Sequence, residues 1–436
     1  MASTMTHAMK ALLFAGTIVG AMLLATPLAR ALPRFAARSG NTCIQCHVSP
    51  SGGGVRNSYG RNVFERNWLP LSLDRSPESW LHEGGDAPDT QEGADTEPDD
   101  GGLFAFSGDI VDGLALGADL RLAYIWIRPD RGLTPDAEPS ITSSFFLMQA
   151  DLYVHAQLHE NVSFVLDIGA YSGFEAWALI RAEAEPGDFD LAVRAGRFMP
   201  AFGIREVEHQ LYTREGVGFS QADLETGVEV SAYLGPVTAQ VALVNGSLGG
   251  PPFDSAGSSR SDFEMAVIAR VDARAELGWA RGQLGGSFYF SGNGNQANPL
   301  LARGIPPLRS GEVGLGVDEY RIGAFATANL GRFTYLGDVV YVRDDFVSDQ
   351  LFALEGYASY QELSFVVIQG LDLVLTFEFA DPDIEILNDY RMRVGGVIEL
   401  FPIQYTELRL MVRHTWNDSA TAGGGWDIVG FLHVFM

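Results

Sequence analysis

Cys43 and Cys46 are the only cysteines in the 436-residue chain, and His47 directly follows the second of them. The stretch Cys43-Ile44-Gln45-Cys46-His47 has the C-x-x-C-H spacing at which a c-type haem is attached. At this spacing two thiols reach the two vinyl groups of one haem, and the adjacent imidazole binds its iron as the proximal ligand. The motif therefore predicts one covalent haem c, with Cys43 and Cys46 as attachment residues and His47 as an iron ligand.

Two other kinds of site use the same residue types. A C-x-x-C pair also forms disulfides, and two cysteines with a histidine supply part of a zinc site. A structural zinc ion takes four protein ligands, and the sequence has no second cluster of cysteine and histidine. We therefore favour haem attachment over a disulfide or a zinc site.

The sequence leaves the sixth coordination position of the iron open. No methionine occurs between Met22 and Met148, so the region around the motif cannot supply the usual methionine ligand. His82 is our first candidate for a second iron ligand. Three histidines later in the chain compete with it: His155, His159 and His433. Arg56 and Arg61 are candidates to pair with the haem propionates.

The N-terminus has the three parts of a secretory signal. A weakly charged start ends at Lys10, an apolar stretch follows, and Ala29-Arg30-Ala31 forms an A-x-A cleavage site. We predict a signal peptide over residues 1 to 31. No later apolar run reaches the roughly 18 residues that a membrane-spanning helix needs, so a membrane-embedded chain would have to cross as strands.

The charge balance narrows the range of partners. The formal net charge is -26, and removal of the signal, which carries Lys10 and Arg30 but no acid, makes it more negative. This balance argues against a nucleic-acid partner and is compatible with metal cations. The 50 glycines and 27 phenylalanines suit an all-β protein better than a helical one.

Composition divides the mature chain into three zones. Residues 32 to 82 contain the motif and form the predicted monohaem cytochrome c segment. Eight acidic and no basic side chains occur between Glu83 and Gly102, which predicts a solvated acidic linker over residues 83 to 107. Residues 108 to 436 form the third zone, which we predict to be the barrel described next.

Side chains alternate with a period of two through the third zone. In residues 151 to 159 the odd positions are polar or aromatic and the even ones are apolar. Residues 162 to 169 and 391 to 400 repeat this pattern, which is typical of strands with one wet and one apolar face. About 16 such segments occur, and they start near residues 112, 143, 161, 176, 188, 224, 236, 262, 279, 318, 331, 351, 371, 390, 404 and 425.

Short and long connections alternate between these segments, as in barrels whose short turns face the periplasm. A soluble sandwich or propeller also alternates, but it would put its apolar face inward, and side chains alone could not fill a barrel of this width. We predict an all-β protein: a transmembrane antiparallel β-barrel of about 16 strands in the outer-membrane lipid, preceded by a small, partly helical monohaem cytochrome c segment. The long connection from Met199 to Asp223 should fold over or into the pore mouth.

The residues around the motif resemble a known family. Phe35 and Ala36 precede the motif, Pro50 follows it, and a Gly60-Arg61-Asn62-Val63-Phe64 element comes next. Together with the motif they resemble the N-terminal segment of outer-membrane monohaem cytochrome c-porin fusions, a family that includes iron oxidases. The resemblance covers the haem segment in detail and the barrel only in architecture. The stretch from Gly196 to Gly203 also looks like one found in anion-selective porins.

The resemblance implies electron transfer across the cell outer membrane through one haem. Extracellular ferrous iron would be the donor and a periplasmic electron carrier the acceptor, so the chain would be an iron oxidase of cytochrome c type. One alternative is a passive porin whose haem segment acts as a plug, gate or redox sensor. Another is a barrel that uses the haem on a diffusing small molecule. The sequence does not separate these functions.

Overall fold

The structure of the chain is a computed structural model. It describes residues 33–64, 69–73, 109–111, 113–130, 139–170, 173–183, 190–206, 208, 210–215, 217–221, 223–246, 265–292, 317–346, 353–417 and 424–435. The predicted signal peptide (1–31), the predicted acidic linker (83–107) and His82 lie outside the described residues.

Sixteen long strands in the described part of the chain make up a single antiparallel sheet. They are β2 (Leu114–Pro129), β3 (Thr142–His159), β4 (Val162–Gly169), β5 (Gly173–Glu183), β6 (Asp190–Phe198), β7 (Glu225–Leu234), β8 (Val237–Val244), β9 (Ala266–Leu277), β10 (Ala280–Ser291), β11 (Val317–Leu330), β12 (Phe333–Phe346), β13 (Leu354–Ile368), β14 (Leu371–Asp381), β15 (Arg391–Leu400), β16 (Thr406–Asn417) and β17 (Gly425–Phe435). A three-residue strand, β1 (Asp109–Val111), pairs with the start of β2.

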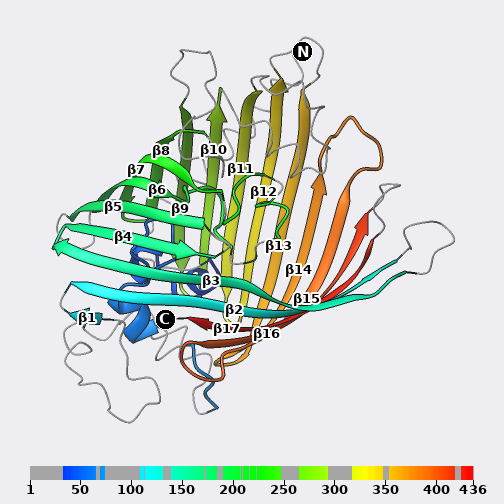
Figure 1. Cartoon of the computed structure of the whole chain (residues 1–436), viewed down its shortest axis with the longest axis horizontal. Coiled ribbons are helices and arrows are strands. Elements are labelled where there is room, and N and C mark those ends of the chain that lie inside the picture. The colour runs from blue at the N-terminus through cyan, green and yellow to red at the C-terminus, as the bar shows by residue number, and fades with distance from the viewer. Residues whose placement is uncertain are drawn as a thin grey trace.

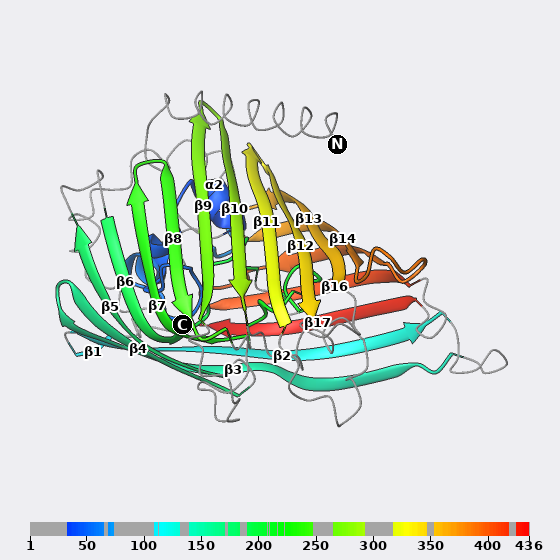
Figure 2. The same cartoon turned by 90° about the horizontal axis from the view of Figure 1, so that it is seen from above.

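The sheet closes on itself, because each strand pairs with the next and β17 pairs with β2, from Asp119 opposite Phe435 to Pro129 opposite Gly425. Figures 1 and 2 show the resulting barrel from two directions. Closure removes the sheet edges that would leave backbone groups unpaired in lipid. The predicted barrel of about 16 strands is confirmed, and each strand begins within four residues of its predicted start.

Strand β14 shows how the barrel sorts its side chains. Its inward positions, which include Asp372 and Glu378, are buried, while outward Leu375 is 64% exposed. This order is the reverse of a soluble protein, where apolar side chains face the interior and polar ones face water. The exposed apolar exterior therefore suits the hydrocarbon of a membrane.

Residues 33–64 lie inside the barrel (Figures 1 and 2, blue) and are called the plug below. Residues 69–73 lie at the barrel end, where Leu71 donates to the Phe401 carbonyl and Ser72 bridges to Gln369. The plug contains three short helical elements: α2 (Pro33–Ser39), α3 (Cys43–Cys46) and the π-helical η1 (Tyr59–Phe64). Among the described residues, no helix has the length and apolar character to span a membrane.

Hydrogen bonds to opposite walls hold the plug in the lumen. Arg38 of α2 donates to Thr334 on β12, and Arg194 on β6 donates to Ser49 of the plug. Ile44 also belongs to an apolar cluster with wall residues such as Trp177. Packed protein therefore fills part of the lumen.

The apolar exterior predicts a stability difference between two leucine substitutions. Leu375 lies in the middle of β14 and faces outward, whereas Leu387, 87% exposed, lies in the connection that follows β14. Leu375→Arg should lower the free energy of unfolding in lipid vesicles by about 2–4 kcal/mol, because it puts a charge into hydrocarbon. Leu387→Arg is the control and should have little effect. Equal losses in urea titrations of the two variants would contradict a lipid-facing position for Leu375.

Candidate functional site

The C-x-x-C-H motif forms one helical turn and the start of a tight loop. Thr42 precedes the turn, and its backbone N–H donates to the Gln45 side chain at 3.0 Å, which fixes the N-terminal end of α3. His47 follows in an extended conformation and forms an antiparallel bridge with Arg56. The Asn57 side chain closes the loop by donating to two carbonyls of α3.

The space beside the motif is lined by glycine. Gly52, Gly53 and Gly54 follow one another in the left-handed region, with φ of +80°, +70° and +61°. A Cβ on Gly52 would lie 3.3 Å from Sγ of Cys43, and a Cβ on Gly53 would lie 2.6 Å from the Arg205 guanidinium. Glycine is the residue that takes up this conformation without strain and leaves this room.

Neither cysteine forms a disulfide, and burial raises the pKa of the Cys43 thiol. His47 is 3% exposed, and neither of its ring nitrogens makes a hydrogen bond of normal geometry to the described chain. Burial and the charges of Arg56 and Arg205 lower the pKa of His47 to about 3, so its imidazole is neutral near pH 7. A buried neutral imidazole with unpartnered nitrogens is suited to binding a metal.

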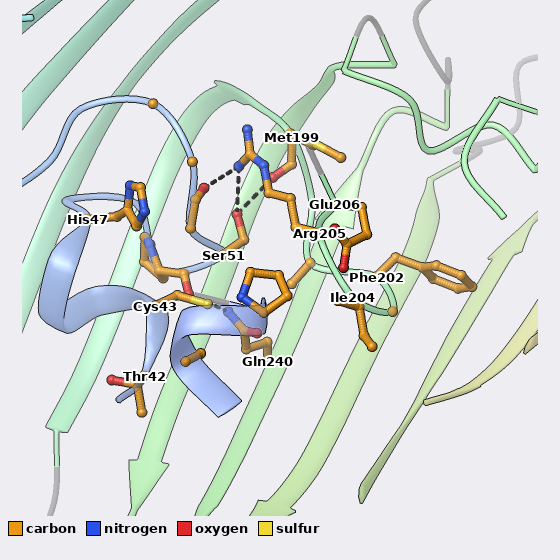
Figure 3. A pocket seen from close by; sticks show the side chains of 18 of the residues that line it. Thr42, Cys43, His47, Ser51, Met199, Phe202, Ile204, Arg205, Glu206 and Gln240 are labelled. Atoms are coloured by element: carbon orange, nitrogen blue, oxygen red, sulfur yellow. Dashed lines mark hydrogen bonds between the residues drawn. The ribbon is translucent and has the colours of Figure 1, made fainter. Parts of the chain in front are cut away.

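A cavity of about 160 Å³ lies between the plug and the barrel wall. Figure 3 shows Cys43, His47 and Ser51 of the plug around it, together with Met199, Arg205 and Gln240 from the barrel chain. The two thiols, the imidazole and the glycine turn are the groups at which a c-type haem would attach, and a haem, with four pyrrole rings, is larger than this cavity.

The three later histidines that compete as second iron ligands do not converge on His47, and His82, the first candidate, lies outside the described residues. His433 is engaged at both nitrogens, 2.7 Å from Glu407 and 2.7 Å from Asp119, so the structure contradicts it as a ligand. Neither His155 nor His159 lines the cavity. No group of three or more His, Cys, Asp or Glu side chains in the described ranges is arranged to hold a metal ion.

Met199 lines the cavity although it lies far from the motif in the sequence. Reasoning from the neighbourhood of the motif misses it, because only the closed barrel brings β6 to the plug. Arg56, a predicted propionate partner, also lines the cavity. Arg61 instead donates to the Arg56 carbonyl at 3.0 Å and is 3% exposed, so it holds the backbone of the plug and does not face the cavity.

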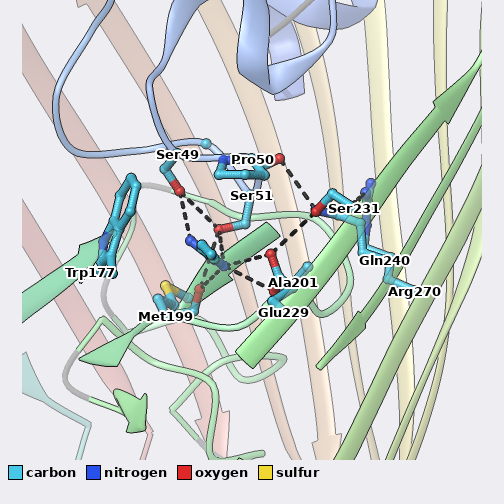
Figure 4. Close-up of polar contacts among 12 residues, drawn as sticks. Ser49, Pro50, Ser51, Trp177, Met199, Ala201, Glu229, Ser231, Gln240 and Arg270 are labelled. Carbon is cyan, nitrogen blue, oxygen red and sulfur yellow. Dashed lines mark hydrogen bonds and ion pairs between the residues drawn. The ribbon is translucent and has the colours of Figure 1, made fainter. Parts of the chain in front are cut away.

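Arg194 of β6 anchors the loop that follows the motif. Its guanidinium donates to the Ser49 hydroxyl at 3.0 Å and to the Ser51 hydroxyl at 3.1 Å. It also donates to the Met199 carbonyl at 2.8 Å and pairs with Glu229 at 2.9 Å (Figure 4). Arg194 is fully buried, so these partners offset the free-energy cost of removing its charge from water.

The connection between β6 and β7 folds into the lumen, as predicted. We call it the inner loop; its described residues lie between Met199 and Leu224. Arg214 of this loop pairs with Asp338 on β12 at 3.2 Å, and Arg205 donates to the Gly52 carbonyl of the plug. The inner loop therefore contacts both the far wall and the loop of the haem motif.

A second set of ion pairs holds α2 against the opposite wall. Arg34 pairs with Glu362 at 2.6 Å and with Glu399, while Arg38 pairs with Asp372 at 2.6 Å. All of these side chains are at least 89% buried. We call these five side chains the α2 latch.

Comparison with known proteins identifies the barrel by its fold. No family model and no curated protein matches the sequence. The chain is similar in structure to OprB of Pseudomonas putida, with a TM-score of 0.51, 10% identity, and coverage of 74% of this chain and 94% of that one. It is also similar to an anion-selective porin from Comamonas acidovorans, with a TM-score of 0.50, 11% identity, and coverage of 74% and 99%.

The chain thus has the fold of outer-membrane porins. The closed 16-strand barrel and its apolar exterior agree with the predicted location in the outer membrane. Both matched structures leave about a quarter of this chain uncovered.

The Arg194 anchor predicts a large stability effect. Arg194→Met leaves the Glu229 carboxylate buried without its partner, which typically costs about 3–5 kcal/mol of unfolding free energy. It should also release the Ser49–Ser51 loop, so proteolysis within the plug should become faster. Arg181→Met is the matched control, because Arg181 pairs with Asp190 but is 34% exposed. Equal urea midpoints and equal cleavage rates for both variants would contradict the anchor.

Proposed function

We propose that this chain is an outer-membrane electron-transfer protein that carries one c-type haem inside its barrel. The observation that carries the proposal is the position of His47, which is buried in the lumen, neutral, and without a hydrogen bond of normal geometry at either ring nitrogen among the described residues. Cys43 and Cys46 lie four residues and one residue before it, and neither forms a disulfide. The resemblance to monohaem cytochrome c-porin fusions supports the same assignment.

The residues of the chain would position the haem and set its environment. Cys43 and Cys46 would hold the haem through thioether bonds, and His47 would bind its iron. When bound, haem c supplies a centre for one-electron transfer. Gly52 keeps a side chain out of the space beside the Cys43 thiol, and Gly53 does the same beside the Arg205 guanidinium. Arg194 fixes the loop from Ser49 to Ser51 to the barrel wall and so sets the position of the motif in the lumen.

A position inside the lumen matters because the apolar band of such barrels is about 25 Å tall. A haem held in the lumen would shorten the distance that an electron travels from an extracellular donor and the distance to a periplasmic carrier. The net charge of -26 favours a cationic donor, and with the family resemblance it leads us to propose ferrous iron as substrate. One electron would pass from each ferrous ion, which becomes ferric, to the carrier.

A second candidate function is a porin in which the plug limits or gates passage. The α2 latch and the inner loop occupy the lumen. The porin fold supports this candidate more directly than it supports electron transfer.

The haem assignment predicts two results with the purified full chain. The haem should stay on the denatured protein in a gel, and the double variant Cys43→Ala, Cys46→Ala should lose it. Ferrous iron added to the oxidised protein should then reduce the haem absorption bands. A chain without covalent haem would remove electron transfer altogether. Reduction by dithionite but not by ferrous iron would remove iron as the donor.

The plug function predicts a change in conductance. Arg34→Gln with Arg38→Gln removes both cations of the α2 latch and should raise single-channel conductance several-fold, because three buried carboxylates then repel one another and the plug loosens. Arg181→Gln is the control, since it breaks an ion pair that does not involve the plug. If the double variant conducts like the control, the plug does not gate the pore through this latch.

A further inference from the structure

Strand β3 continues well beyond the end of its neighbour β4. β3 has 18 residues and β4 has eight, and their pairing begins only at Asp151, opposite Gly169. One further bond extends it, from the Ala170 amide to the Ala150 carbonyl. The first part of β3, from Thr142 onward, therefore has β2 on one side and no strand on the other within the described chain. Figures 1 and 2 show β2 and β3 running together past β4.

We call residues 142–147 the free edge. A shift in the β2–β3 register follows at Met148, so these six residues form the regular part of the unpaired stretch. All six are exposed. Besides its ladder with β2, the free edge makes one hydrogen bond in the described chain, from the Ser144 hydroxyl to the Phe145 carbonyl at 3.0 Å. The backbone groups that point away from β2 thus have no strand to bond to among the described residues.

The free edge lacks the features that usually protect an unpaired strand. Natural edge strands are often blunted by charged side chains or by proline. The free edge reads Thr-Ser-Ser-Phe-Phe-Leu, and no charged residue occurs between Pro139 and Ala150. Phe145 is 73% exposed and Phe146 is 38% exposed. Because successive side chains of a strand point to opposite faces, apolar side chains are exposed on both faces of this edge.

The free edge also lies at the level of the membrane. The outward ring of Phe145 is 4.8 Å from that of Tyr124 on β2, and both rings are exposed, as is Leu147. Trp126 follows two residues after Tyr124, and tryptophan is enriched where a barrel meets the membrane–water boundary. Most of the free edge therefore lies on the hydrocarbon side of that boundary. Water cannot satisfy unpaired backbone groups there, so an open edge in lipid is unfavourable.

We propose that the free edge pairs with the free edge of a second copy of this chain, antiparallel and across a two-fold axis. The occupant of an edge at this depth must itself be an uncharged strand edge in the membrane, and a second copy supplies one. In this pairing the first residue of one edge lies near the last residue of the other, and no charge lies along either edge. Two copies of a chain with a net charge of -26 therefore meet without like charges opposite one another.

The proposed contact uses the same surface on both copies, as closed two-fold dimers do. Backbone hydrogen bonds would join the two sheets, and the exposed phenylalanine side chains would pack across the junction. The proposal goes beyond the proposed function, because it involves neither the haem motif nor the plug.

Cross-linking of the full chain in membranes tests the position of the contact. Ser144 lies near the middle of the free edge, so Ser144→Cys places two thiols close to the two-fold axis and should give a covalent dimer with a short cross-linker. Leu375→Cys is the control, because Leu375 also faces outward but lies on β14, and it should stay monomeric. The wild type gives the background from its native cysteines.

A charge at the edge tests the strength of the contact. Ser144→Lys should raise the dissociation constant of the dimer in detergent by about tenfold or more, because two like charges then face one another across the junction. Ser140→Lys is the matched control, since Ser140 is exposed but lies just before β3, and it should leave the dimer unchanged. Light scattering gives the molar mass, and heat-dependent gel migration checks that each variant folds.

Each outcome decides the proposal. A dimeric wild type that cross-links at Ser144→Cys and dissociates in Ser144→Lys supports it. A monomeric wild type in detergent and in membranes overturns it, as does an unchanged dissociation constant in Ser144→Lys. A dimer that cross-links at Leu375→Cys and not at Ser144→Cys places the interface elsewhere. A Ser144→Cys product whose mass differs from twice that of the chain shows that a different protein covers the edge.

Discussion

Charge pairing inside the lumen is the constraint on which the rest of the structure depends. A barrel with an apolar exterior turns its polar side chains inward, and the plug then cuts many of them off from bulk water. A buried charge without a partner is strongly destabilising. The plug supplies part of this pairing, because Arg34 and Arg38 form ion pairs with three wall carboxylates that would otherwise repel one another more strongly.

The same constraint links the plug to the inner loop. Arg205 reaches from the inner loop to the Gly52 carbonyl and lies against Gly53, where a Cβ would collide with its guanidinium. Arg194 binds the plug hydroxyls and the Met199 carbonyl with one guanidinium. Movement of the plug would therefore disturb the inner loop, so the two act as one packed unit.

The site also depends on the absence of side chains at three consecutive glycines. Gly52, Gly53 and Gly54 stand outside the family resemblance that the sequence shows, and their positive φ values explain why they are glycine. They form a turn without side chains next to Cys43, and one of their carbonyls holds Arg205. The imidazole of His47 is thereby buried among backbone and two arginines, which keeps it neutral.

Local pattern was enough to predict the barrel and the motif. Period-two alternation marks each strand because the side chains of a strand point to opposite faces, and the strand starts agree within four residues. The haem motif is readable because its chemistry needs adjacent residues, Cys43, Cys46 and His47. The entry of the connection after Met199 into the lumen also followed from its length and its charged residues.

Contacts between distant residues were decided only by the tertiary structure. Arg194 and Ser49 are 145 positions apart, and Asp167 gains its neighbours from the register of three strands. His433 seemed free to bind iron until closure of the barrel placed it between Asp119 and Glu407. The sequence pattern predicts which face of a strand a side chain points to. Closure of the barrel and the register of its strands decide which neighbours that side chain contacts. Those neighbours set the charge, burial and chemistry of each lumen residue.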